Sequence, residues 1–193
     1  MPLGLSTMKA LTTLDMSHND LQDAPAVIFG MTSALRTVLL AHNRVPRLPQ
    51  SWFTMSRLAH MDLSSNCLEG PLPRALGQLK ELEVLLLRDN LLTELPETAS
   101  QLTRLRVLEL DHNKIATALP AGLSRLQRLW RCTTSHNFLP EAPSGLFHLP
   151  LLSAWDLSWN RRIVSQYVDW HERERAFSPE VDFMPLPMLQ VRA

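Results

Sequence analysis

Residues 105–113 read Leu-Arg-Val-Leu-Glu-Leu-Asp-His-Asn, and the same nine-residue pattern, L-x-x-L-x-L-x-x-N, occurs seven times along the chain. Some blocks replace an inner leucine by another apolar residue, cysteine or threonine. The blocks cover residues 11–19, 35–43, 58–66, 82–90, 105–113, 129–137 and 152–160, so their closing asparagines are 23 or 24 residues apart. A fixed period of this length is typical of a solenoid, in which each repeat forms one coil and neighbouring coils share a core.

The alternation inside each block predicts one short strand per coil. Side chains on a strand point to opposite faces with a period of two, so positions 4 and 6 of the block face the core and positions 3 and 5 face solvent. The expected inward pairs are Leu14/Met16, Val38/Leu40, Met61/Leu63, Leu85/Leu87, Leu108/Leu110, Cys132/Thr134 and Trp155/Leu157. Asparagine at position 9 is expected to bond backbone groups at the following turn, because its amide offers two donors and an acceptor.

The segments between the blocks predict the return path of each coil. A proline at the first helical position followed by leucines three residues apart, as at 73–79 and 120–126, favours one turn of α or 3₁₀ helix. Blocks and connecting segments together resemble the leucine-rich repeat family over residues 1–163. The L-P step and repeat length, as in Asn90 to Pro96, are similar to the intracellular 23/24-residue, Ras-suppressor-like class, and the units at 68–73 and 115–120 are plant-like. The resemblance implies an α/β solenoid, a right-handed horseshoe of about seven repeats with a parallel concave β-sheet and a C-terminal helical cap.

Three segments are expected. Residues 1–163 form the leucine-rich repeat solenoid, residues 164–176 (VSQYVDWHERERA) an amphipathic C-terminal capping helix, and residues 177–193 a Pro-rich apolar tail. The chain begins part-way through a coil without a polar cap, so either it is a fragment or another surface covers that end. The tail is expected to rest on the convex face of the chain or on a partner.

Composition limits the classes of partner and the compartment. Lys plus Arg equals Asp plus Glu, at 19 each, so no overall field favours nucleic acid or an anionic membrane. No apolar run approaches the ~18 residues of a membrane span, and no signal peptide is recognisable. Cys67 and Cys132 lie three coils apart, about 14 Å at the usual strand spacing, which is beyond disulfide reach. These features favour a reducing intracellular compartment, either cytoplasm or an organelle interior.

Motifs for catalysis, cofactors or metals were not found in the sequence. It has no Gly-rich phosphate loop, no paired-cysteine spacing, no H-E-x-x-H and no G-x-S-x-G. Histidines at position 8 form two neighbouring pairs, His18 with His42 and His112 with His136, expected within about 5 Å of each other. Two histidines make only half of a metal site, so we interpret them as solvated turn residues. We therefore expect no enzyme activity, no cofactor and no bound metal.

The outward side of the predicted sheet is the candidate binding surface. Apolar side chains stand at outward positions that the fold does not need filled, and charged side chains surround them, as in an interaction patch. The candidate residues are Leu39, His60, Asp62, Val84, Leu86, Arg88, Val107, Glu109, Asp111, Arg131 and Asp156. We expect them to bind a protein segment with bulky apolar and basic side chains. The open amino-terminal coil and the C-terminal tail are further candidate contacts.

The sequence therefore predicts a non-enzymatic protein-interaction module, a scaffold or structural subunit docked in a larger assembly. Two alternatives remain at this point. The repeats are the substrate-recruiting region of a larger signalling enzyme, as in bacterial ubiquitin ligases and receptor kinases, or an RNA-associated subunit of an organellar ribonucleoprotein. Neutral charge and the acidic column weigh against direct contact with nucleic acid.

Overall fold

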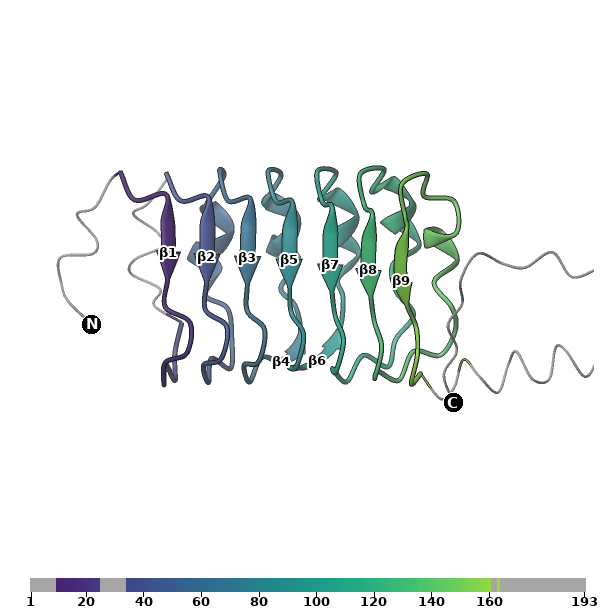
Figure 1. The fold of residues 1–193 in the computed structure, drawn as a ribbon, viewed down its shortest axis with the longest axis horizontal. Helices are drawn as coiled ribbons and strands as arrows, with labels where there is room; N and C mark the ends of the chain where they lie inside the picture. Colours follow the sequence, from purple (N-terminus) through teal and green to yellow (C-terminus); the bar gives the residue numbers. More distant parts are fainter. Residues whose placement is uncertain (1–9, 25–33, 161–162, 164–193) are drawn as a thin grey trace, which may run out of the picture.

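The computed structural model describes residues 10–24, 34–160 and 163 (Figure 1). These residues form successive coils that each contribute one short strand to a single sheet. The expected capping helix (164–176), the apolar tail (177–193) and the amino-terminal half-coil up to residue 9 lie outside the described residues. Within the described part, no helix is long and apolar enough to cross a membrane.

All seven predicted strands are present and pair in parallel, one block after the next. They are β1 (Thr13–Asp15), β2 (Thr37–Leu39), β3 (His60–Asp62), β5 (Val84–Leu86), β7 (Val107–Glu109), β8 (Arg131–Thr133) and β9 (Ala154–Asp156), in that order across the sheet. The register aligns equal positions of the blocks, so that Leu85, for example, lies between Met61 and Leu108. Position 3 and position 5 therefore each form a continuous column across the sheet.

The opposite side of the solenoid consists of short 3₁₀ helices, which Figure 1 shows behind the sheet. They are η2 (Gln50–Thr54), η3 (Arg74–Gln78), η4 (Glu97–Gln101), η5 (Ala121–Arg125) and η6 (Ser144–Leu146). Each begins after a proline that occupies the N-cap, one residue earlier than the first helical position that the sequence suggested. The proline carbonyl accepts the first helical hydrogen bond, as Pro96 does from Ala99, while the ring fixes φ for the entry.

A second, two-stranded parallel sheet joins two neighbouring coils away from the main sheet. It pairs β4 (Glu69–Pro71) with β6 (Leu91–Glu94), and its register shifts between Gly70 and Pro71. Gly70 has φ +73°, a conformation that glycine adopts without steric cost. Thr93 of β6 has no register partner between Leu92 and Glu94, so β6 carries the bulge.

The core follows the predicted alternation. In the five central coils the inward side chains at positions 4 and 6 have at most 1% of their surface exposed, from Val38 and Leu40 to Cys132 and Thr134. In the two outer coils Met16, Trp155 and Leu157 are only partly buried. Burying one leucine side chain contributes about 1.5–3 kcal/mol, so this stack is the main source of stability.

The asparagines form the predicted ladder. From Asn43 to Asn160, each side-chain amide donates to the position-6 carbonyl of its own coil and to that of the preceding coil. The amide oxygen accepts a backbone N–H two residues beyond the preceding asparagine, as Asn113 does from Leu92 at 3.0 Å. The ladder thus satisfies buried backbone groups that no strand reaches.

Candidate protein-binding surface

The outward side chains of the seven-stranded sheet form the surface that the sequence singled out, called the sheet face below. In most strands the central residue is buried and its two neighbours are half-buried or exposed. The position-3 column reads Thr13, Thr37, His60, Val84, Val107, Arg131, Ala154, and the position-5 column reads Asp15, Leu39, Asp62, Leu86, Glu109, Thr133, Asp156. Both columns therefore lie next to each other on the outward side of the sheet.

Three apolar side chains of the sheet face lie together on β5 and β7. Val84 is the register partner of Val107, and Leu86 follows two residues later on the same side of β5. All three are half-buried. Leu39, by contrast, stands apart from them, because Asp62 of β3 lies between Leu39 and Leu86 in the position-5 column. The apolar patch is therefore Val84, Leu86 and Val107, without Leu39.

Charged side chains surround this patch. Arg131 lies beside Val107 in the register and its Nε is 2.7 Å from Oε1 of Glu109. Arg88 is exposed, with Nε 3.2 Å from Oδ2 of Asp89. The Arg88–Asp89 pair is exposed, and such pairs stabilise a fold by about 0–1 kcal/mol, so Arg88 remains able to exchange partners. The Arg131–Glu109 pair is part-buried.

The position-5 aspartates have a local structural role that the sequence reasoning did not assign. Oδ1 of Asp15, Asp62 and Asp156 accepts the backbone N–H two residues later, at 2.8–3.0 Å. The N–H of Ser17 stabilises the charged form and holds the pKa of Asp15 below its ordinary value. These contacts are Asx turns, which fix the chain where it leaves the strand. The acidic column therefore does not need a basic partner to explain it.

Asp111 was expected on the exposed surface, and this expectation is wrong, because only 8% of the residue is exposed. Its Oδ1 accepts the backbone N–H and the hydroxyl of Ser135, both at 2.8 Å, and its Oδ2 accepts the hydroxyl of Thr133. The physical reason lies in the neighbouring coil, where Thr133 occupies position 5 and supplies no carboxylate for the Ser135 N–H. Asp111 of the preceding coil supplies it instead.

Ser135, His136 and Asp111 are the residue types of a nucleophilic trio, but their hydrogen bonds run differently. In such a trio the serine hydroxyl donates to the imidazole. Here the hydroxyl of Ser135 donates to Asp111, and Nδ1 of His136 is 3.4 Å from the serine oxygen. Ser135 is also only 6% exposed. These hydrogen bonds hold the turn after β8 in place, and the Ser135 hydroxyl is directed to Asp111 and not to the imidazole that would activate it.

His60 differs from the other outward residues of β3. It is half-buried between Thr37 and Val84 in the position-3 column. Its Nε2 is buried and has no hydrogen-bond partner among the described residues. A buried nitrogen without a hydrogen-bond partner costs free energy, so His60 lowers the stability of the fold at the edge of the apolar patch.

Position 8 of each block lies in the turn after the strand, and the aromatic side chains at this position stack on one another. All seven position-8 residues have φ between 52° and 58°, the left-handed conformation. The predicted pairs are confirmed: ring centroids are 4.4 Å apart for His18 and His42 and 4.0 Å for His112 and His136, and Trp159 extends the second stack at 5.2 Å from His136. Desolvation and the His112 ring lower the pKa of His136. In the described ranges, no three His, Cys, Asp or Glu side chains are grouped to hold a metal.

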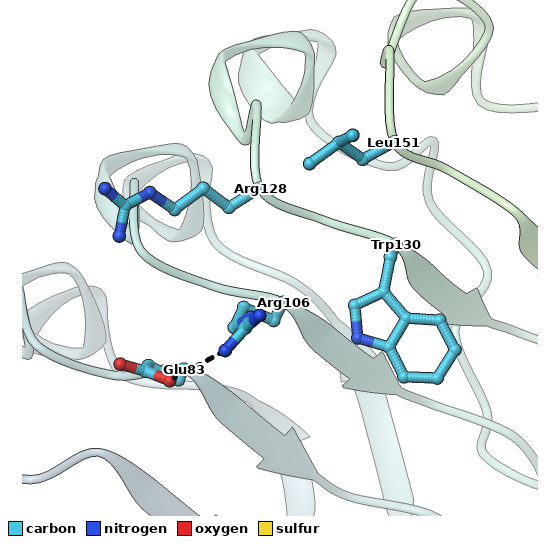
Figure 2. A pocket seen from close by; sticks show the side chains of 5 residues that line it. All are labelled: Glu83, Arg106, Arg128, Trp130 and Leu151. Atoms are coloured by element: carbon cyan, nitrogen blue, oxygen red, sulfur yellow. Dashed lines mark ion pairs between the residues drawn. The ribbon is translucent and has the colours of Figure 1, made fainter.

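A depression at the start of the strands was missed by the sequence reasoning. Glu83, Arg106, Arg128, Trp130 and Leu151 line a hollow of about 540 Å³, called the rim depression below. Figure 2 shows Glu83, Arg106 and Trp130 just before three consecutive strands, with the Arg128 and Leu151 side chains beside them. These residues stand at position 2 of a block or directly before it, outside the outward positions 3 and 5 of the strand. An exposed tryptophan at position 2 was the available signal.

Family models for the leucine-rich repeat match residues 8–24, 33–92 and 80–139. Residues 33–139 alone are more than half of the 193-residue chain. The chain belongs to the leucine-rich repeat family. Among curated proteins, none matches the chain at a significant level.

Solved leucine-rich repeat structures share this fold. The ectodomain of the Arabidopsis thaliana membrane receptor kinase GASSHO1/SCHENGEN3, in complex with Casparian strip integrity factor 2, is 28% identical over 82% of this chain, with a TM-score of 0.76. The ectodomain of the A. thaliana receptor kinase SOBIR1 is 30% identical over 61%, with a TM-score of 0.56. A Leptospira interrogans leucine-rich repeat protein, 23% identical over 84% with a TM-score of 0.67, shows the fold alone.

The aligned residues span only part of each of these three leucine-rich repeat structures. They cover 19% of the first, 65% of the second and 50% of the third. The repeats of the family serve in protein interaction, and that general role applies here. The activities and partners of those proteins are not assigned to this chain by the shared repeats.

Proposed function

We propose that this leucine-rich repeat chain is a non-enzymatic interaction module that binds a protein segment across the sheet face at β5, β7 and β8. The observation that carries the proposal is the contiguous patch of Val84, Leu86 and Val107, half-buried on the outward side. The fold does not require apolar side chains at these positions, since Thr, His, Arg and Asp occupy them in other coils. Apolar groups ringed by charge are typical of interface centres.

The finer form of the proposal is a scaffold or structural subunit of a larger assembly in a reducing compartment. Free Cys67 and Cys132 support that compartment, and the 23/24-residue spacing supports the intracellular class. A second candidate is the recruiting region of a larger signalling receptor. It is favoured by the similarity to two receptor-kinase ectodomains, one of them solved with a bound partner. Labelling exposed Cys67 in intact cells with a membrane-impermeant maleimide separates the two, because only a surface receptor reacts.

Site-specific photo-crosslinking tests the sheet-face assignment. A photoreactive amino acid is placed at Leu86 on β5 and, as a control, at Gln78, an exposed residue of η3 on the opposite side. In native cells we expect a discrete crosslinked partner from position 86 and none from position 78. Equal crosslinking from both positions, or from position 78 alone, contradicts the proposal.

A further inference from the structure

Two columns of side chains line the edge where the strands begin. The first column is the residue directly before each block, and the second is position 2 of the block. From the fourth block to the seventh they read Glu81, Arg104, Arg128, Leu151 and Glu83, Arg106, Trp130, Ser153. Lateral ion pairs confirm the alignment, since Arg104 contacts Glu81 and Arg106 contacts Glu83 across neighbouring coils.

The charges along this edge do not balance. Arg104 is paired closely with Glu81, whereas Nη1 of Arg106 is 3.6 Å from Oε2 of Glu83, with both side chains well exposed. Arg128, one coil further, forms no ion pair with any residue the structure describes. Positive charge therefore extends one coil beyond the acidic residues that neutralise it. A carboxylate from outside would do for Arg128 what Glu81 does for Arg104.

Apolar side chains line the same depression as this unpaired charge. Trp130 is 42% exposed and Leu151 55% exposed, and both line the rim depression with Arg106 and Arg128. Tryptophan and arginine are the residue types most enriched among residues that dominate binding energy. The volume of about 540 Å³ lies in the range of ligand pockets, which suits one bulky side chain and its flanking backbone.

We propose that the rim depression binds an extended peptide segment of a partner protein in which an acidic side chain stands next to a bulky apolar one. The carboxylate pairs with Arg128, and with Arg106 when Arg106 releases Glu83. The apolar side chain packs against Trp130 and Leu151. Arg106 and Trp130 directly precede outward residues of β7 and β8, so this segment adjoins the sheet face without depending on it.

Peptide selection tests the proposal on the full chain. Random peptides displayed on phage are selected on the folded protein, and the enriched sequences are synthesised with a fluorescent label. We expect enrichment of Asp or Glu beside Leu, Ile, Phe or Trp. Trp130→Ala should weaken binding about 30-fold or more, as truncation of a dominant interface residue does. Arg128→Glu should weaken it about tenfold, and added salt should weaken it further.

Control variants test whether the loss of binding is specific to the rim depression. Arg125→Glu makes the same charge change three residues from Arg128, on η5, and Phe138→Ala truncates another exposed aromatic ring; neither should alter binding. Leu86→Glu should leave these peptides bound, so failure of the sheet-face proposal is seen separately. The rim proposal is overturned by no enrichment, by enrichment of basic peptides, by binding that Trp130→Ala and Arg128→Glu leave unchanged, or by equal competition from a single-stranded RNA oligomer.

Discussion

Replacing Asn113 by alanine removes one rung from the middle of the asparagine ladder. Asn113 is 5% exposed, and its Oδ1 accepts the N–H of Leu92 at 3.0 Å. Its Nδ2 donates to the carbonyls of Leu87 at 2.9 Å, Leu110 at 3.1 Å and Asp111 at 3.2 Å. All three carbonyls keep a second donor, because the amides of Asn90 and Asn137 reach the first two and the backbone N–H of Asp89 reaches the third. The Leu92 N–H loses its acceptor and is left buried.

The size of the effect follows from this count. A buried donor without a partner costs about 1–3 kcal/mol, and each further hydrogen bond lost to an otherwise satisfied carbonyl costs about 0.5–1.5 kcal/mol. We therefore expect Asn113→Ala to lower the free energy of unfolding by about 3 kcal/mol. A typical domain has only about 5–15 kcal/mol in total. With a urea m-value of about 2–3 kcal/mol/M, the unfolding midpoint should fall by about 1 M.

Asn19 provides the matched control at the exposed end of the ladder. Its Nδ2 donates to Met16 and Ser17 carbonyls, the residue is exposed, and Met16 keeps the amide of Asn43. Asn19→Ala should therefore cost less than about 1 kcal/mol. Urea unfolding is followed by far-ultraviolet circular dichroism and tryptophan fluorescence, whose agreement tests two-state behaviour. Equal losses for the two variants would refute the ladder reasoning.

Further predictions concern the thiols, a histidine and a close-packed glycine. Burial raises the pKa of Cys132 to about 12 while Cys67 is exposed, so iodoacetamide at mildly alkaline pH should add one label to the folded chain and two to the denatured chain by mass spectrometry. The folded protein lowers the pKa of His136 from 6.5, so the unfolded chain binds that proton more readily and stability should fall as the pH drops below 6.5; a His136→Gln melting curve that keeps the full pH dependence would contradict this. Gly77→Ala places a Cβ 2.6 Å from the Thr98 carbonyl oxygen and should cost about 1–3 kcal/mol in thermal unfolding, and an unchanged melting temperature would show that the coils separate easily.

The features that repeat with the block could be predicted from the sequence. Leu87 and Asn113 hold their roles because the fold places positions 6 and 9 of the inner coils in the same buried environment. One coil is then a template for the others. The position-8 histidine pairs followed for the same reason, since adjacent strands set their separation.

Features that depend on a particular pair of neighbouring coils could not be predicted this way. Asp111 is buried only because Thr133 in the next coil lacks a carboxylate. Leu39 is separated from the apolar patch only because Asp62 intervenes. The rim depression lies where Trp130 follows Arg106 in the position-2 column and Arg128 stands directly before the same block, and neither column belongs to the outward positions 3 and 5. Each of these features depends on which side chains stand next to one another in adjacent coils, and the pattern of a single block does not contain that information.

The alternation between core and binding surface is tested most directly at two adjacent residues of one block. Leu86 is half-buried on the outward side and Leu87 is fully buried, with 0% exposed. Both Leu86→Glu and Leu87→Glu are assayed by thermal unfolding and by capture of the partner identified by crosslinking. Leu87→Glu should unfold the chain, because a buried carboxylate has no compensating partner there. Leu86→Glu should shift stability by less than about 1 kcal/mol yet abolish capture; a folded Leu87→Glu protein, or a Leu86→Glu protein that still captures its partner, would contradict the account.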